Sequence, residues 1–370
     1  MKIGILTMHR VVNYGSALQA YALQHKLESM GYEAELIDYV FPTTRNVSFL
    51  VRMQKKVRRR FYMMRIGKGF SATKERKFRI FRNSFLKVSN FAYNRRTLIE
   101  NPPYYDVYMV GSDQVWNPQW IKNDPSFLLT FVRNGQIKVS YASSFTVSAI
   151  EDKYKDYYAS ALEQFQFISV REKSGVSIVH QLLGKNAEFV CDPTILLSED
   201  DYEPLIKTAK VRVEGPYILA YILGYMFNPF PEVNRIISSV CSELELPVVY
   251  LDGNKYVVFD KSCRTVSEVG PCEFLWLIKN ASFVITSSYH GCIFSSIFNI
   301  PFMGIVKKGR SDDRIVSLLW QLGNSKSLVY YDSDVSICKD KLSFYLPQND
   351  RVNSFRNNSI KILTQMLEVP

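Results

Sequence analysis

The sequence lacks the cysteine and histidine patterns that hold metal ions or crosslink small secreted domains. Its six cysteines stand apart without a C-x-x-C pair, and its 370 residues include only four histidines. The motifs H-E-x-x-H and G-x-S-x-G and a metal-binding pair of aspartates are also missing, so metal-dependent and ordinary serine hydrolysis have no support. We therefore expect no bound metal, and we expect reduced thiols of the kind found in the cytosol.

Glycine loops that bind phosphate are missing as well. No G-x-G-x-x-G follows the first predicted strand, and no G-x-x-x-x-G-K-[ST] occurs. Dinucleotide binding and P-loop chemistry are therefore unsupported. No helix-turn-helix pattern, zinc finger or paired aromatic strand motif accompanies the positive charge, so we expect no nucleic-acid partner.

Long hydrophobic runs do not occur. The N-terminus passes from Met1 into the short apolar run Ile3–Leu6 without the features of a signal peptide, and no stretch of 18 apolar residues follows. We expect a soluble, cytoplasmic protein. The charge distribution raises one alternative, which is contact with the inner face of the cell membrane.

The sequence does have the composition of a globular protein with two domains, since 47% of its residues are apolar and 14% are aromatic. Short apolar strands alternate with helical patterns twice along the chain. This alternation predicts an α/β fold with two Rossmann-like sandwiches that face each other across a cleft. We place the first domain at 1–205 and the second at 206–370. A last helix at about 353–367 could pack back on either domain, the N-terminal domain included.

The net charge of +11 is concentrated in one segment. Residues 51–82 hold thirteen Lys or Arg and a single acid, Glu75, whereas the rest of the chain is close to neutral. The segment lies in a predicted basic helical insertion at about 45–100. Two interpretations stay open: a solvated helix docked by its apolar face, or a surface that attracts anionic lipid headgroups or a pyrophosphate-bearing acceptor. The apolar face of that helix is predicted to consist of Met53, Val57, Phe61 and Met64.

In parallel α/β sheets, ligands bind beyond the carboxyl ends of the strands, so we look for chemistry in the loops that follow strands. His290 lies on such a turn, between a buried strand and a helix, where backbone N–H groups and the helix dipole favour an anion. Gly291 would let a ligand approach the backbone closely. The structural alternative is a histidine that only caps the helix.

Other polar residues follow strands in the same way. Arg171 ends a predicted strand, and its planar guanidinium suits a carboxylate or phosphate. Asp113 and Asp192 are placed to act as a base or to bind a hydroxyl, although Asp192 before a proline also suits a turn. His9 and Asn13 lie in the first loop between a strand and a helix. A cluster of cations follows a later strand and would add positive potential: Lys307, Lys308, Arg310 and Arg314.

Taken together, these runs resemble the polysaccharide pyruvyl transferase family. The resemblance spans almost the whole chain in the family's order. It is carried by KIGILTMHRVVNYGSALQAYALQ at 2–24, VGSDQVWNP at 110–118, SYASSF at 140–145, SVREKSG at 169–175, VCDPT at 190–194, SSYHGCIFSSIFNIPF at 287–302 and DRIVSLL at 313–319.

The resemblance implies a fold similar to that of the B-type glycosyltransferases. It also implies phosphoenolpyruvate as the donor co-substrate, with no further cofactor, and a sugar of a surface polysaccharide or of its lipid-linked precursor as the acceptor. The product would be a pyruvate ketal across two sugar hydroxyls, with phosphate released. The family's histidine before glycine falls on His290, and the arginine of its S-x-R-E run falls on Arg171.

One position departs from the family pattern. Many relatives have an arginine two residues before the histidine, where this chain has Ser288, so a second basic contact must come from elsewhere. The candidates are Lys307, Lys308, Arg310 and Arg314. We expect His290 and Asp113 to act in catalysis, and we expect the remaining candidates to bind substrate, Ser288 and Gly291 included.

Two rival functions belong to other classes. A B-type glycosyltransferase would bind a nucleotide sugar in the same cleft, with His9 near the transferred sugar. A non-catalytic scaffold at the membrane surface would use the basic helix and would leave the polar loops after the strands without a role.

Overall fold

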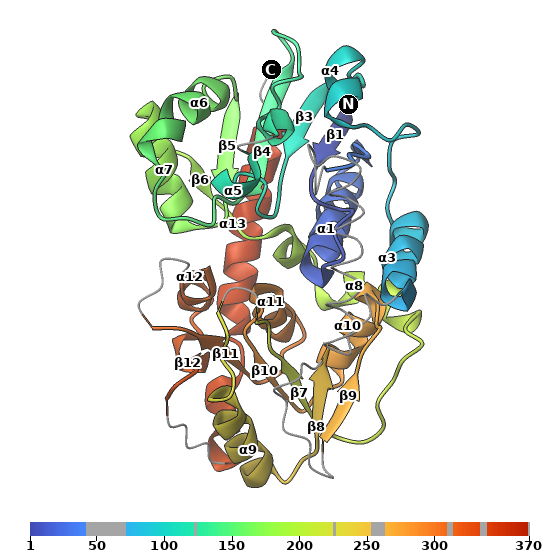
Figure 1. Ribbon diagram of the computed structural model, residues 1–370, viewed down its shortest axis with the longest axis vertical. Coiled ribbons are helices and arrows are strands. Elements are labelled where there is room, and N and C mark those ends of the chain that lie inside the picture. Colours follow the sequence, from blue (N-terminus) through green and yellow to red (C-terminus); the bar gives the residue numbers. More distant parts are fainter. Residues whose placement is uncertain are drawn as a thin grey trace, which may run out of the picture.

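The structure is a computed structural model, which describes residues 1–41, 72–121, 124–224, 227–252, 263–308, 314–333 and 339–368 (Figure 1). The apolar face proposed for the basic helix and the candidate Arg310 lie outside these ranges. No described helix has the length and the apolar character needed to cross a lipid bilayer.

Two parallel sheets organise the described chain, and each has six strands. The first has the order β2 (Glu33–Leu36), β1 (Lys2–Leu6), β3 (Val107–Val110), β4 (Ile137–Ser143), β5 (Phe167–Val170) and β6 (Glu188–Phe189). The second has the order β12 (Leu328–Tyr330), β11 (Phe302–Val306), β10 (Phe283–Thr286), β7 (Ile218–Tyr221), β8 (Val248–Leu251) and β9 (Cys263–Val266). The predicted strand-and-helix alternation is therefore present in both halves.

Helices cover the sheets and connect their strands. Those before β7 are α1 (Tyr14–Ser29), α3 (Ala72–Phe85), α4 (Arg95–Glu100), α5 (Pro118–Ile121), α6 (Asp152–Leu162), α7 (Lys173–Leu183) and α8 (Glu199–Lys207). Those after β7 are α9 (Val233–Leu244), α10 (Pro271–Lys279), α11 (Tyr289–Ile297), α12 (Arg314–Gln321) and α13 (Asn349–Leu367). Short 3₁₀ turns are η1 (Pro125–Leu128), η2 (Pro193–Leu196), η3 (Ser325–Ser327) and η4 (Lys339–Tyr345).

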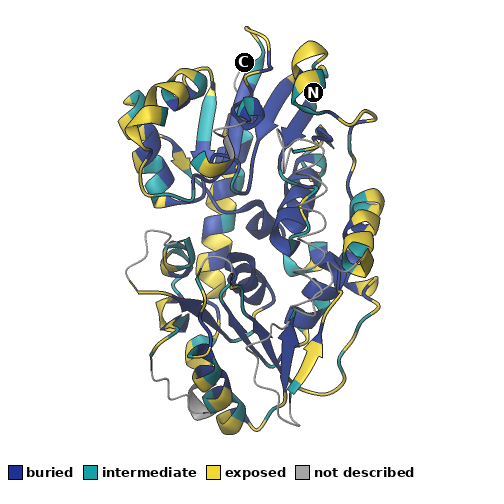
Figure 2. Cartoon of the chain, in the orientation of Figure 1, coloured by how far each residue is buried: buried dark blue, intermediate teal, exposed yellow. Residues whose placement is uncertain are grey.

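The helices α1 and α11 lie at the junction of the two domains. Each begins in the loop after a strand and is capped by the side chain of the preceding residue, which accepts a hydrogen bond from a backbone N–H of the first turn. Figure 2 shows both helices as almost wholly buried, in contrast to the half-exposed α6 and α9. The loops that lead into α1 and α11 therefore lie at the domain junction.

Aromatic side chains join the domains into one core at this junction. Tyr14 of α1 stacks on Phe274 of α10, with ring centroids 4.6 Å apart, and Tyr202 of α8 meets Phe294 of α11 edge to face at 5.2 Å. All four belong to one cluster of buried residues that draws on both sheets. Burial of rings of this size dominates the energetics of such an interface.

The last helix, α13, runs from the second domain into the first (Figure 1). Ser359 accepts a hydrogen bond from the backbone N–H of Cys191 at 2.9 Å, and Arg356 donates to the carbonyl of Ile195 at 2.6 Å. Phe355 packs on Phe189, with ring centroids 5.4 Å apart. Helix α13 therefore contacts the N-terminal domain, at the point where β6 leads into η2.

The described part of the basic segment, α3, also links the domains. Phe78 and Phe81 are its buried residues. Lys74 pairs with Asp252 after β8, and Lys77 pairs with Glu273 of α10 at 2.8 Å. Part of the positive charge that the sequence concentrates here thus faces carboxylates of the second domain.

Candidate active site

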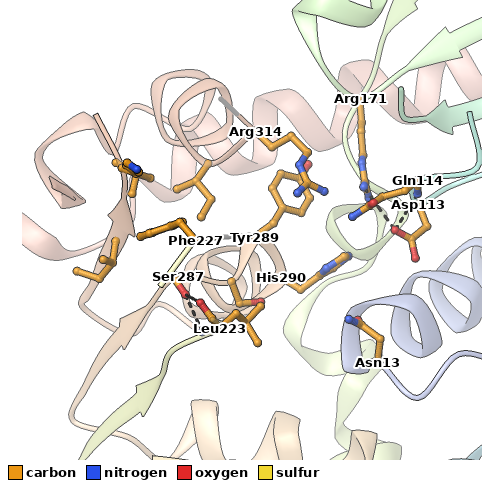
Figure 3. A pocket seen from close by; sticks show the side chains of 15 residues that line it. Asn13, Asp113, Gln114, Arg171, Leu223, Phe227, Ser287, Tyr289, His290 and Arg314 are labelled. Atoms are coloured by element: carbon orange, nitrogen blue, oxygen red, sulfur yellow. Dashed lines mark hydrogen bonds and ion pairs between the residues drawn. The ribbon is translucent and has the colours of Figure 1, made fainter. Parts of the chain in front are cut away.

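A polar pocket lies between the two domains, at the carboxyl ends of their strands. The first domain contributes Asn13, Asp113, Gln114 and Arg171. The second contributes Leu223, Phe227, Ser287, Ser288, Tyr289, His290, Ile305, Val306, Lys307, Arg314 and Ile315 (Figure 3). The pocket therefore brings together seven of the predicted site residues, from segments that are up to 301 positions apart.

Arg171 occupies the wall of the first domain, directly after β5, and only 4% of its surface is exposed. Its Nη1 donates to Asp192 Oδ2 at 2.7 Å, and Nη2 and Nε lie 3.6 Å from carboxylate oxygens of Asp113 and Glu172. Burial alone would lower the pKa of Arg171, but the three carboxylates outweigh it and raise the pKa further. The guanidinium is thus a permanent positive charge, and its Nε has no hydrogen-bond partner among the described residues.

Asp192 is fully buried and helps to hold the Arg171 guanidinium in place. Its Oδ1 accepts hydrogen bonds from the backbone N–H of Thr194 at 3.1 Å and from its hydroxyl at 2.7 Å. Burial raises the pKa of Asp192, but its interactions with His290, Arg171 and Thr194 outweigh that effect and hold the pKa well below its usual range. Asp192 therefore serves both as the predicted turn former and as a charged partner within the site.

His290 lies in the first turn of α11, rather than on the loop before it. Its Nε2 is 3.6 Å from Asp192 Oδ2 and has no hydrogen-bond partner among the described residues. The ring packs against the first turn of α1: a Cβ placed on Gly15 would lie 2.0 Å from His290 Nδ1. The missing side chain of Gly15 is therefore what makes room for the imidazole between the two helices.

Asp113 connects the loop after β3 to α1. Its Oδ2 accepts a hydrogen bond from the Ser16 hydroxyl, and its Oδ1 accepts one from the backbone N–H of Gln114 at 2.8 Å. Its backbone has a φ of +73°, in the left-handed region that aspartate tolerates better than most residues. Both oxygens are thus engaged, which suits Asp113 to positioning Arg171 and α1.

Two of the residues predicted to bind substrate have structural roles in the described chain. The position where a Cβ would stand on Gly291 is 2.5 Å from the Thr286 hydroxyl, so this glycine makes room for a core side chain and not for a ligand. The Gly291 N–H donates to the Ser288 hydroxyl at 3.3 Å, which makes Ser288 the N-cap of α11. Ser288 still lines the pocket, but it brings no charge to it.

His9, predicted to contact a ligand, does not line this pocket. Its side chain is buried away from the pocket, with Nε2 3.0 Å from Asp38 Oδ1 and Nδ1 3.2 Å from the Thr7 carbonyl. Burial raises the pKa of Asp38, but the hydrogen bonds from His9 and Arg10 outweigh it and hold the pKa well below its usual range. The partner of His9 is an acid that lies just after the neighbouring strand β2, and the spacing of the sequence does not reveal this contact.

The remaining candidates are divided between the two walls. Asn13 lines the pocket and caps α1, because its Oδ1 accepts a hydrogen bond from the Ser16 N–H at 3.2 Å. Lys307, at the end of β11, and Arg314, at the start of α12, line the opposite wall. Lys308 is described but does not line the pocket.

The sequence reasoning missed Tyr289 and Gly15. Tyr289 presents its ring to Arg171, whose guanidinium carbon is 4.9 Å from the ring centroid, a cation–π contact. The signal for Tyr289 was its place beside His290 on the same turn. Gly15 had no local signal, since its role depends on a helix 275 positions away.

The acidic residues of the site do not form a metal centre. Within the described ranges, no group of three or more His, Cys, Asp or Glu side chains is arranged to hold a metal ion. The carboxylates of Asp113, Glu172 and Asp192 are directed at Arg171 instead.

Comparison with solved structures shows which known folds this chain resembles. The chain is similar to a UDP-GlcNAc 2-epimerase from Methanocaldococcus jannaschii, at 11% identity with a TM-score of 0.50, and the match covers 99% of this chain and 100% of that one. It is also similar to MnaA of S. aureus, solved with UDP, at 11% identity with a TM-score of 0.52, covering 100% and 99% of the two chains. These likenesses and the two parallel sheets confirm the predicted two-domain, Rossmann-like fold of the B-type glycosyltransferases.

Comparison at the level of sequence is more specific. No curated protein matches the chain. A family model described as polysaccharide pyruvyl transferase matches residues 13–306, which include the loops that carry Asn13, Asp113, Arg171 and His290. The match covers well over half of the 370 residues. The chain therefore belongs to the polysaccharide pyruvyl transferase family.

Proposed function

We propose that this protein transfers the pyruvyl group of phosphoenolpyruvate onto two hydroxyls of one sugar, forming a pyruvate ketal and releasing phosphate. The acceptor is a sugar of a surface polysaccharide or of its lipid-linked precursor. One observation carries the proposal: the buried guanidinium of Arg171 shares a pocket between the domains with the imidazole of His290, whose Nε2 has no hydrogen-bond partner among the described residues. A permanent cation beside a group that can give and take a proton suits an anionic donor that must be protonated.

Arg171 would orient the donor. Its side chain is fixed by Asp192, Asp113 and Tyr289, so little conformational entropy is lost when a ligand binds. The donor's carboxylate would face this guanidinium, which holds a planar anion better than a lysine does.

His290 would move the protons. Protonation of the methylene carbon of phosphoenolpyruvate gives an oxocarbenium-like centre at the carbon that bears the phosphate. A sugar hydroxyl attacks this carbon and gives up its proton to a base; the C–O bond to phosphate then breaks, and a second hydroxyl closes the ketal. His290 Nε2 lies 3.6 Å from Asp192 Oδ2. This carboxylate would stabilise the imidazole while it carries a proton between the two proton transfers.

The activity is tested by incubating the full chain with phosphoenolpyruvate and synthetic or lipid-linked glycosides that carry a free pair of hydroxyls. The expected product is a glycoside heavier by one pyruvate less one water, with one phosphate released for each ketal. Absence of the ketal, together with transfer of a sugar from one of a panel of nucleotide sugars, would favour the rival glycosyltransferase.

The place of action follows from the acceptor. Work on a lipid-linked sugar would put the protein in the cytoplasm at the inner face of the cell membrane, and the excess positive charge of residues 51–82 suits that surface. Sedimentation with anionic but not with neutral vesicles, in low salt, is the expected result. Equal sedimentation with both kinds of vesicle, or with neither, would remove the membrane from the proposal.

A further inference from the structure

The wall of the first domain carries more negative than positive charge. Three carboxylates, from Asp113, Glu172 and Asp192, lie within 3.6 Å of the Arg171 guanidinium. Glu172 and Asp192 are almost completely buried, so solvent screens them little. This wall can receive one carboxylate of a ligand at Arg171, but it would repel a second anionic group.

Phosphoenolpyruvate has two anionic groups, a carboxylate and a phosphate, at opposite sides of one carbon. If the carboxylate meets Arg171, the phosphate needs positive charge on another surface. Ser288, at the N-cap of α11, does not supply that charge, because it is neutral and its hydroxyl already caps the helix.

The opposite wall of the same pocket does supply it. Lys307 directly follows β11 and lines the pocket, and Arg314 begins α12. Figure 3 shows Arg314 directed toward Tyr289. Both Arg171 and Arg314 act on the Tyr289 hydroxyl: burial raises its pKa, and these two cations oppose the rise. Tyr289 therefore lies between the two domain walls, where both cations act on it electrostatically.

We infer that Arg314 and Lys307 form a phosphate subsite on the wall of the second domain, and that the donor lies across the pocket with its carboxylate at Arg171 and its phosphate at Arg314. The inference rests on the proposed function, because it takes phosphoenolpyruvate as the ligand. In this arrangement Arg314 is the residue that selects a phosphorylated donor. Arg314, at the start of α12, supplies the positive charge that Ser288, at the start of α11, lacks.

Calorimetry with two small anions separates the two ends of the pocket. Inorganic phosphate probes the phosphate end alone, and pyruvate probes the carboxylate end alone. In Arg314→Ala, affinity for phosphate should fall at least about tenfold while affinity for pyruvate stays within twofold. Arg171→Lys should show the reverse. Lys308→Ala is the matched control, since it removes the same type of charge one residue from Lys307 without lining the pocket.

Turnover distinguishes this inference from the proposed function. If wild type forms the ketal and Arg314→Ala keeps an unchanged KM for phosphoenolpyruvate, the inference is wrong and the function stands. If the wild-type protein forms no ketal but Arg314→Ala lowers the affinity for phosphate, the proposed function is wrong and the phosphate subsite stands. Loss of pyruvate affinity in Arg314→Ala would place the carboxylate at the second domain and overturn the orientation.

Discussion

Individual side chains of the site hold one another in place. Arg171 and Asp192 form a buried pair at 2.7 Å, and His290 Nε2 lies 3.6 Å from the same carboxylate. Removing one member leaves a buried charge without its partner, which costs more than the pair contributes. The strand-end positions of Arg171 and His290 could be predicted from the sequence, because a buried strand before a polar turn is a local pattern. The contact partners could not, because they come from the other strands and from the other domain.

Replacement of His290 by alanine tests its chemical role. We expect kcat for ketal formation to fall by about 10²–10⁴-fold, the range for loss of a general acid–base group. Circular dichroism should show an unchanged fold, since the ring already borders a pocket. The control is His180→Ala, an exposed histidine of α7. Comparable rates in His290→Ala and wild type would remove His290 from the mechanism.

Gly15→Ala tests the contact between the two helix starts. The added methyl would lie 2.0 Å from His290 Nδ1, so the imidazole must move or α1 must shift. We expect a loss of activity together with a lower Tm. In a His290→Ala background the space is open, so the same change at Gly15 should no longer lower Tm. A Tm penalty that is equal in both backgrounds would show that the two residues are not coupled.

At the scale of helices and strands, burial decided which elements the sequence revealed. The strands β1, β7 and β10 are short apolar runs with both faces covered, which is the local pattern from which the alternation of strands and helices was predicted. The edge strand β9 was missed because two of its four residues, Arg264 and Thr265, are exposed and polar.

Helix α8 was missed for a different reason. It contains Pro204 in its interior, and a proline inside a segment normally argues against a helix. The contact of Tyr202 with Phe294 and the neighbouring α10 compensates for the lost hydrogen bond. Tertiary packing of this kind cannot be seen in a local pattern.

Ser359→Ala tests how strongly α13 holds the N-terminal domain. The Ser359 hydroxyl accepts the Cys191 N–H and donates to the Phe355 carbonyl, so its loss leaves a buried N–H without a partner. We expect the free energy of unfolding to fall by about 1–3 kcal/mol. Thr364→Ala is the matched control, because that hydroxyl bonds only within the helix, to the Ile360 carbonyl. An equal loss in both variants would mean that the hydrogen bond from the Cys191 N–H to Ser359 does not contribute to the free energy of unfolding.

At the scale of the whole molecule, the pair of sheets and the pocket between them could be predicted from the strand-and-helix alternation. The shared aromatic core and the bridging α13 could not, because they depend on how the domains meet. Their consequence is that the two walls of the pocket are held by buried contacts on both sides of the junction. We therefore expect the domains to unfold together, as a single calorimetric transition.

The stability of this assembly should depend on acid pH through Asp192. Its pKa is lowered on folding from an ordinary value of 3.8, so the ionised form stabilises the fold above that pH. This contribution is lost as the pH falls from about 3.8 toward the lower folded value. Asp192→Asn should therefore lower the free energy of unfolding at pH 7 and flatten its decline below pH 4. Asp156→Asn, at an exposed carboxyl of α6, should leave the pH profile unchanged; identical profiles in wild type and Asp192→Asn would contradict this assignment.

One measurement tests the central claim most directly. The full chain is incubated with phosphoenolpyruvate and a glycoside that offers two neighbouring hydroxyls, and the glycoside mass and the free phosphate are followed together. The account predicts equal amounts of pyruvylated glycoside and phosphate, with both signals abolished in His290→Ala. Production of both at wild-type rates by His290→Ala, or absence of pyruvylated product from every acceptor tried while a nucleotide sugar is consumed, would contradict it.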